Sequence, residues 1–158
     1  DIYTKAELNS FLNNKVDFRG EYFTDNIDAS FRNKHFYNCY FYKVKFDELN
    51  MYMNNFHYCY FFDCKFHDLK IRDCSFGYCN FSGCDFTFCD FTKCHFGCND
   101  FELGVAVYLK LDGCDFWRNK ICFREIEITH QNTKVEEEFL PAKTQFLGEK
   151  IILRREED

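Results

Sequence analysis

Large apolar residues recur at every fifth position through the middle of the chain, with polar residues between them. A period of five fits neither the 3.6-residue turn of an α-helix nor the two-residue alternation of a β-strand. A helix would spread these side chains around its circumference, and a strand would divide them between two faces. Fourteen such residues share one register: Phe36, Phe41, Phe46, Met51, Phe56, Phe61, Phe66, Ile71, Phe76, Phe81, Phe86, Phe91, Phe96 and Phe101.

Cysteine forms a second column, two positions before the first. A cysteine so placed is a small core filler, so we expect these thiols to point into the interior. Their spacing is in multiples of five and no CxxC pair occurs, which removes the usual zinc-ligand pattern. The column contains Cys39, Cys59, Cys64, Cys74, Cys79, Cys84, Cys89 and Cys94, and Cys114 rejoins it two positions before Phe116.

The exceptions to the phenylalanine column recur at steps of twenty. Met51, Ile71 and Leu111 replace Phe, and each has Leu two positions earlier. If four units of five residues make one coil, residues twenty apart stack directly, at about 4.8 Å, as in any β-ladder. The exceptions then form one wall of a square tube, and the sequence predicts a parallel β-solenoid over residues 29–123.

Two segments, Cys79-Asn80-Phe81-Ser82-Gly83 and Val16-Asp17-Phe18-Arg19-Gly20, carry a small residue, a polar residue, Phe, a polar residue and Gly. This pattern resembles the pentapeptide-repeat protein family, in a cysteine-rich variant. The resemblance implies an all-β solenoid, a right-handed quadrilateral parallel β-helix whose central Phe and preceding small residue point inward. The chain departs from the family in its many cysteines and in its loss of register at both ends.

Both ends of a solenoid expose apolar side chains and unpaired strand edges, so we expect caps. Thr4 and Glu7 have capping-box spacing, and the sequence predicts a helix from about Thr4 to Asn14. The segment after Phe123 breaks the repeat; it is expected to cover the last coil, to form a hairpin or to pair two subunits in a homodimer. The predicted division is an N-terminal capping helix over residues 1–15, repeats over 16–123 with an insertion at 26–28, and a C-terminal cap or dimerisation tail over 124–158.

Composition limits the function classes. The chain carries a net charge of −6, but residues 29–123 hold eleven acidic and eleven basic residues, so the rod is neutral and direct nucleic-acid binding is disfavoured. No long apolar run or signal peptide is visible, which favours a cytoplasmic protein without membrane contact. The histidines form no triad order or HExxH motif, and no glycine-rich phosphate loop occurs. We therefore expect no catalytic residue, no metal, no cofactor and no enzymatic activity.

Aromatic residues occupy outward positions that solenoids normally fill with polar ones. They are predicted to gather around the corner between the Phe36 and Phe41 walls, and several pairs lie twenty apart. Such a patch is favoured at protein interfaces. Stabilisation of the ladder by stacked tyrosines explains the pattern equally well. The candidate partner-binding residues are Tyr37, Tyr40, Tyr42, Tyr58, Tyr60, Phe62 and Tyr78.

Three functions compete at this point. The first is a non-catalytic protein–protein interaction module that presents the rod, in particular its aromatic residues, to a protein partner. The second is implied by the family resemblance: a DNA mimic that binds and protects a type II topoisomerase (gyrase), for which the neutral rod is a poor match. The third is a thiol-based redox or metal-storage protein, which requires accessible thiols. Cys98 and Cys122, outside the inward column, are the candidates for reactive thiols.

Overall fold

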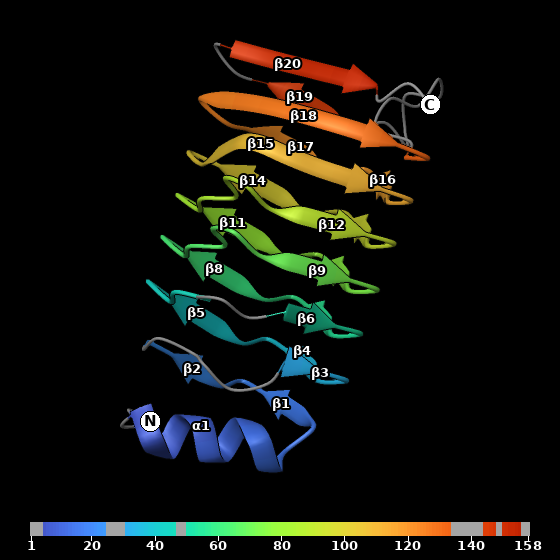
Figure 1. Ribbon diagram of the computed structural model, residues 1–158. Coiled ribbons are helices and arrows are strands. Elements are labelled where there is room, and N and C mark those ends of the chain that lie inside the picture. Colours follow the sequence, from blue (N-terminus) through green and yellow to red (C-terminus); the bar gives the residue numbers. More distant parts are fainter. Residues whose placement is uncertain (1–4, 25–30, 47–49, 134–143, 148–149, 156–158) are drawn as a thin grey trace.

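The protein is a rod of stacked coils with a helix at one end, in a computed structural model that describes residues 5–24, 31–46, 50–133, 144–147 and 150–155. Helix α1 (Lys5–Asn14) lies below the first coil, at the end of the rod opposite strand β20 (Lys150–Arg155) (Figure 1). The predicted N-terminal helix is thus present from Lys5 onward. The predicted insertion at 26–28 lies outside the described residues.

Three walls of the tube are parallel sheets, each built from strands about twenty residues apart. Sheet A contains β1 (Asp17–Arg19), β4 (His35–Tyr37), β7 (Asn55–His57), β10 (Ser75–Gly77), β13 (His95–Gly97) and β16 (Asp115–Trp117). Sheet B contains β2 (Tyr22–Phe23), β5 (Tyr40–Tyr42), β8 (Tyr60–Phe62), β11 (Asn80–Ser82), β14 (Asp100–Glu102), β17 (Lys120–Cys122) and β19 (Gln145–Leu147). Sheet C contains β3 (Phe31–Arg32), β6 (Asn50–Tyr52), β9 (Lys70–Arg72), β12 (Asp90–Thr92), β15 (Val105–Asp112), β18 (Glu125–Gln131) and β20 (Lys150–Arg155).

The fourth wall is reduced to single bridges that link Lys45, Lys65, Asp85 and Val105. The structure therefore confirms the parallel solenoid of four walls. It also confirms the predicted wall of exceptions, because Met51 pairs with Ile71 and Phe91 with Leu111 along sheet C.

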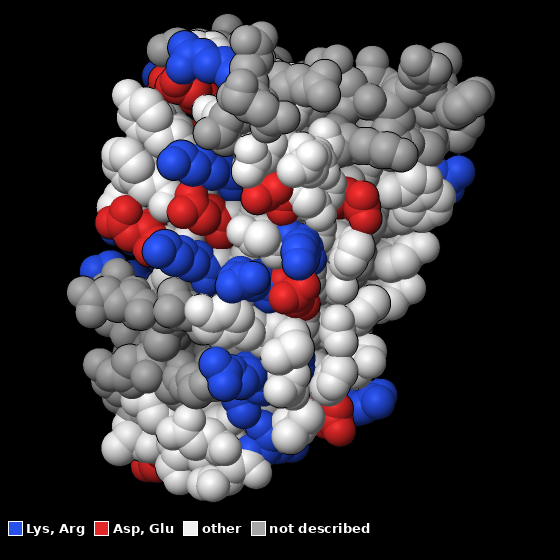
Figure 2. Space-filling view, turned by 45° about the vertical axis from the view of Figure 1, so that its right-hand side comes forward, with Lys and Arg blue, Asp and Glu red and all other residues white. Residues whose placement is uncertain are grey.

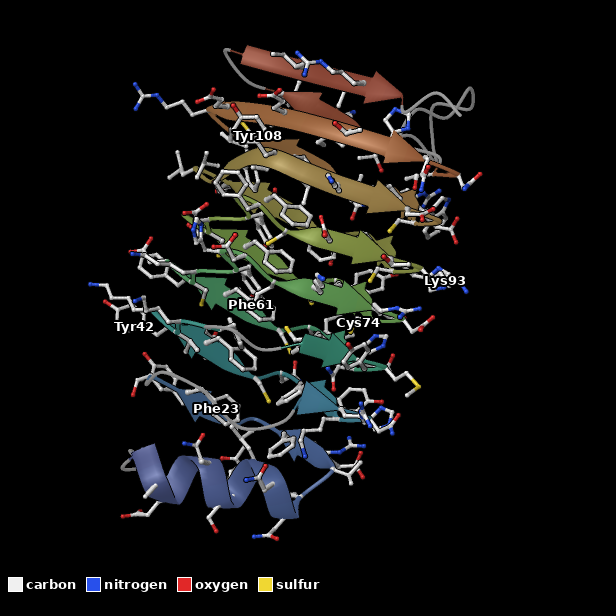
Figure 3. The ribbon with its side chains drawn as sticks, in the orientation of Figure 1. Phe23, Tyr42, Phe61, Cys74, Lys93 and Tyr108 are labelled. Atoms are coloured by element: carbon white, nitrogen blue, oxygen red, sulfur yellow. The ribbon has the colours of Figure 1, made fainter. Side chains whose placement is uncertain are left out.

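Stacked phenylalanine rings fill the axis of the tube. Along sheet A the rings of Phe36, Phe56 and Phe76 follow one another at 4.8 and 5.0 Å, with 4° between neighbouring planes. Figure 3 shows Phe61 inside the tube, where it is 1% exposed, and Tyr42 on its outer edge. Each coil buries its rings against the coils above and below, so the core exists only because the coils stack.

Nine of the eleven cysteines are buried, in the columns that the sequence predicts. Eight of the nine thiols donate to the backbone carbonyl 23 residues earlier, as Cys64 does to Phe41 at 3.1 Å and Cys79 to Phe56 at 3.3 Å, and Cys39 donates to Phe18, 21 residues earlier. Two residues that the register places inward depart from the expectation of a small, buried side chain. Val16 is 53% exposed in the first coil, whereas Lys34 is buried and donates to the carbonyl of Lys15 at 2.8 Å.

Two buried asparagines continue the cysteine column of sheet B. Asn99 accepts from the amide of Cys79 at 2.9 Å, and its own side-chain amide donates to the carbonyl of Phe76 at 2.9 Å. Asn119 repeats the arrangement one coil higher, donating to the carbonyl of Phe96 at 2.9 Å. These amides occupy the space of a thiol and make stronger hydrogen bonds, so the column stays both filled and paired.

The corners of the tube require a left-handed backbone. Sixteen non-glycine residues in the described part of the chain have φ between 49° and 60°, and nearly all lie two positions after a central core residue. Gly20, Gly83 and Gly113 occupy the same position with φ near 65°. None of the sixteen is β-branched, as expected where the left-handed region is disfavoured for branched side chains.

The described part of the C-terminal segment adds further parallel strands. β18 pairs with β15, β19 with β17, and β20 with β18, all in parallel. Ile126 and Ile128 on β18 are therefore core residues of a further coil and not part of a hairpin. Residues 134–143, 148–149 and 156–158 of the predicted tail lie outside the described residues.

Candidate functional site

The seven predicted aromatic residues, with Tyr22 added below them, form one surface that we call the aromatic corner. Tyr40 and Tyr60 begin strands β5 and β8 of sheet B, and Tyr58 and Tyr78 occupy the turn between sheets A and B. The prediction of a single corner is too narrow. Tyr42 and Phe62 lie at the far ends of β5 and β8, so the surface spans the whole outer width of sheet B.

These side chains are exposed to solvent. Tyr58 is 52% exposed, Tyr78 is 56% exposed and Tyr40 is 48% exposed, while Tyr37 on β4 is half-buried. Neighbours twenty residues apart stack, with ring centroids 4.8 Å apart for Tyr40 and Tyr60 and 5.0 Å apart for Tyr58 and Tyr78. The planes differ by 7° in both pairs. The rings therefore cover each other's faces and present their edges outward.

Cations lie over rings at the N-terminal ends of two of these ladders. The guanidinium of Arg19 lies 4.7 Å from the ring centroid of Tyr37, and the ammonium of Lys43 lies 5.3 Å from that of Tyr42. Such contacts are favourable because a ring face carries negative potential. A partner thus meets ring edges and phenol hydroxyls, together with a few positive charges.

The turn positions of Tyr58 and Tyr78 cost backbone energy. Their φ values are 54° and 53°, in the region that costs an L-residue roughly 1–2 kcal/mol. The equivalent turns at Gly20 and Gly113 show that this fold accepts glycine at the position. Stacking of exposed rings returns about 0.2–1 kcal/mol for each pair. The backbone cost of the two turns together exceeds what their one stacked pair returns, so fold stability alone does not account for tyrosine at these turns.

The turn ladder continues from Tyr78 to Cys98, which is half-buried. A hydrogen bond with the Cys98 side chain raises the pKa of Tyr78 above its ordinary value, so the phenol stays protonated and can donate. Cys122, the other thiol outside the core, is exposed at the end of β17. The two candidate reactive thiols thus lie on different parts of the surface, one on the turn ladder and one on sheet B.

A second exposed aromatic stack escaped the sequence prediction. Phe88 is 49% exposed and Tyr108 is 56% exposed, and their rings stack at 5.2 Å. The edge of His67 meets Phe88 at 5.7 Å. The signal was present, because Phe88 and Tyr108 are twenty residues apart at outward positions. This stack occupies the turn between the fourth wall and sheet C, on the opposite corner of the tube.

The surface outside the aromatic corner carries mixed charge. Lys70, Asp90 and Lys110 alternate along the outer face of sheet C, and on the face in Figure 2 basic and acidic side chains are interspersed. Within the described ranges, no group of three or more His, Cys, Asp or Glu side chains is placed to hold a metal. The one helix among the described residues is too short to cross a membrane.

Comparisons with known proteins identify the repeat. The pentapeptide-repeat family matches residues 59–97 as eight copies. Among solved structures, the chain is similar to a trypsin-treated form of QnrB1, a plasmid-mediated fluoroquinolone resistance protein, with a TM-score of 0.46 and 17% identity over 82% of this chain and 79% of that one. It is also similar to HetL, a pentapeptide repeat protein involved in heterocyst differentiation regulation from the cyanobacterium Nostoc, with a TM-score of 0.29 and 9% identity over 96% of this chain and 93% of that one. No curated protein matches the chain.

Proposed function

Since this chain is a pentapeptide-repeat protein, we propose that it is a non-catalytic module that binds another protein through the aromatic corner. The observation that carries the proposal is the exposure of Tyr58 and Tyr78 at turns where glycine fits and tyrosine is disfavoured. Contiguous exposed aromatic residues are typical of protein interfaces, where Tyr is enriched and contributes strongly to affinity.

The rigidity of the ladder favours binding. Rings that are already stacked at coil spacing lose little conformational freedom when a partner covers them. Their phenol hydroxyls supply donors and acceptors across an otherwise apolar surface, as an interface that also meets water requires. The partner expected here has an apolar patch with hydrogen-bonding groups at its centre.

The two other functions gain less support. A DNA mimic needs a continuous acidic surface, whereas Lys70, Asp90 and Lys110 alternate in sign along sheet C. A thiol-based redox or storage role needs accessible sulfur, but nine of the eleven thiols are buried. A homodimer through residues 124–158 is a separate proposal, which sedimentation of the native chain alone would test.

A capture experiment from the source organism's lysate tests the proposal. The native protein is compared with a Tyr40→Ser, Tyr58→Gly, Tyr60→Ser variant and with a Phe88→Gly, Tyr108→Gly variant of the opposite corner. Glycine replaces the aromatic residue at each turn position, so both variants keep the backbone conformation. We expect a protein that is retained by the native chain and by the opposite-corner control, and lost by the first variant. Equal capture by all three would refute the aromatic corner as the binding surface.

A further inference from the structure

In one outward column of sheet A, two successive coils carry glycine where the coils below and above carry aromatic side chains. Parallel pairing places Tyr37, His57, Gly77, Gly97 and Trp117 directly above one another. The column begins as a stack, because the rings of Tyr37 and His57 lie 5.6 Å apart with 17° between planes. It resumes at Trp117, which is 45% exposed. The side-chain ladder is therefore interrupted in its middle.

Backbone geometry does not account for these glycines. Neither Gly77 nor Gly97 has the positive φ of the corner glycines, and each is the last residue of a regular strand. A Cβ atom at Gly97 would meet nothing within 4 Å, so no neighbouring group requires the absence of a side chain. Glycine in a strand leaves no side chain to pack and often marks a place where another molecule approaches closely.

The space left open in this side-chain column is centred on Gly97. The ring of His57 leans over Gly77, since a Cβ atom there would lie 3.1 Å from His57 Nδ1. Apart from Gly97 and its two chain neighbours, no residue, Trp117 and Arg118 included, has an atom within 4 Å of a Cβ placed on Gly97. The open level thus has the imidazole of His57 below it and Trp117 above it, and the guanidinium of Arg118 lies 4.7 Å from the ring centroid of Trp117.

We propose that this gap, which we call the Gly97 slot, receives a planar aromatic side chain of the protein partner. A ring at the level of Gly97 would lie about 4.8 Å above the level of Gly77 and the same distance below Trp117, given the strand spacing of a sheet. Stacked pairs in this protein have that spacing, such as Tyr40 and Tyr60 at 4.8 Å. A planar ring fits the level, and a branched aliphatic side chain is too thick to stack as well.

The slot adjoins the aromatic corner, and the proposal rests on the proposed function in this respect. Gly77 precedes Tyr78, and Gly97 precedes Cys98. The slot is therefore flanked, on the side facing sheet B, by the upper end of the Tyr58–Tyr78 ladder. On the other side, the slot is bordered by His95 and Asp115, whose Nδ1 and Oδ2 atoms lie 2.8 Å apart. A partner lying across the corner can therefore place one ring in the slot.

The chain contains its own reporter, because Trp117 is the only tryptophan. The indole N–H resonance of Trp117 is followed by NMR during titration with a blocked, soluble peptide that carries one phenylalanine. The matched peptide carries leucine in its place. We expect a saturable shift with the phenylalanine peptide, at a dissociation constant on the order of 1–10 mM for a single ring. The leucine peptide should shift the resonance at least threefold less.

Two variants test the location while keeping the reporter. Gly97→Phe fills the slot from within and should abolish the shift, whereas Thr92→Phe adds the same side chain to the outer face of sheet C and should leave it unchanged. His57→Ala removes the lower wall without adding bulk and should weaken the shift at least threefold, so the test does not depend on the folding of Gly97→Phe. Equal shifts with both peptides, or an undiminished shift in Gly97→Phe and in His57→Ala, would overturn the slot.

The same variants separate the slot from the proposed function. If the partner captured by the native chain binds Gly97→Phe equally well but is lost by the aromatic-corner variant, the slot fails and the binding surface stands. If both variants lose the partner while Thr92→Phe keeps it, the partner uses the corner and the slot together.

Discussion

The ring of Phe123 lies on the ring of Phe86, with centroids 6.1 Å apart and 18° between planes. Phe123 is not in the central column, where the corresponding wall position one coil above Phe86 is Ala106. Ala106 is 2% exposed and Phe123 is 3% exposed, so the ring of Phe123 supplies core volume that Ala106 lacks. Gly104 provides the room, because a Cβ atom there would meet Phe123 at 2.7 Å and the carbonyl of Cys84 at 2.6 Å.

The first prediction concerns the packing of the Phe123 ring against Gly104. Gly104→Ala should lower the free energy of unfolding by about 1–3 kcal/mol, because the new methyl group clashes with both a backbone carbonyl and a buried ring. Urea unfolding measures the change. Gly97→Ala is the matched control, since its methyl group meets open space, and it should be neutral or stabilising by up to about 1 kcal/mol. Equal effects of the two alanines would contradict the packing described for Phe123.

The second prediction concerns the corner turns. Tyr58→Gly should change the free energy of unfolding by less than about 1 kcal/mol, because loss of stacking on Tyr78 is offset by relief of the left-handed backbone. Tyr58→Val should be at least 1 kcal/mol less stable than Tyr58→Gly, because a β-branched residue fits this region poorly. Thermal and urea unfolding give both values. A Val variant as stable as the Gly variant would show that the turn imposes no such restriction.

The third prediction concerns the buried thiols. Burial raises the pKa of Cys84 and of Cys89, so both stay protonated in the folded state at a pH where thiols of the unfolded chain ionise. The stability that this provides is fully present below the unfolded pKa of about 8.5 and is lost as pH rises from there toward the folded pKa.

Urea unfolding in reducing buffer at pH 7.5 and 9.5 measures the loss. The native chain should lose about 1.4 kcal/mol more than Cys89→Ala between these two values, because the variant lacks one ionising thiol. Other titrating groups affect both chains equally. An equal loss in the two chains would mean that the Cys89 thiol has an ordinary pKa.

The fourth prediction concerns the asparagine ladder. Asn99→Leu leaves the amide of Cys79 and the carbonyl of Phe76 without their partners, at a cost of about 1–3 kcal/mol for each buried group. Asn99→Cys, which extends the thiol column by one coil, should cost less because a thiol can donate to the same carbonyl. Urea unfolding of the two variants checks the order. A leucine variant as stable as the cysteine variant would mean that these hydrogen bonds contribute little.

The repeat was predictable because identical requirements recur at identical positions. Phe81 and Cys79 are examples of the two recurring positions, the central core residue and the small inward residue two positions before it. The aliphatic residues Met51 and Ile71, twenty positions apart, revealed that four repeats make one coil. Asn99 and Asn119 were not predictable in this way. They are polar side chains at an inward position, and only the carbonyls and amides that they meet in the folded coil explain their burial.

The ends and the surface were harder to predict. Phe123 lies outside the five-residue register, and its place in the core depends on space left by Gly104 and Ala106. Val16 fits the repeat pattern yet is exposed, because the first coil has no complete coil below it. The aromatic ladders followed from the period of twenty, but their extent across sheet B did not, since the period alone does not show where each strand ends.

Tyr78 and Tyr108 provide the most direct test of the aromatic corner. Both are 56% exposed, both occupy left-handed turns and both stack on an aromatic ring one coil below. The affinity of the captured partner is measured by calorimetry for the native chain, Tyr78→Gly and Tyr108→Gly. Binding through the aromatic corner predicts at least tenfold weaker binding by Tyr78→Gly, about 1.4 kcal/mol, and native affinity for Tyr108→Gly. Equal affinity of all three, or a loss confined to Tyr108→Gly, would contradict it.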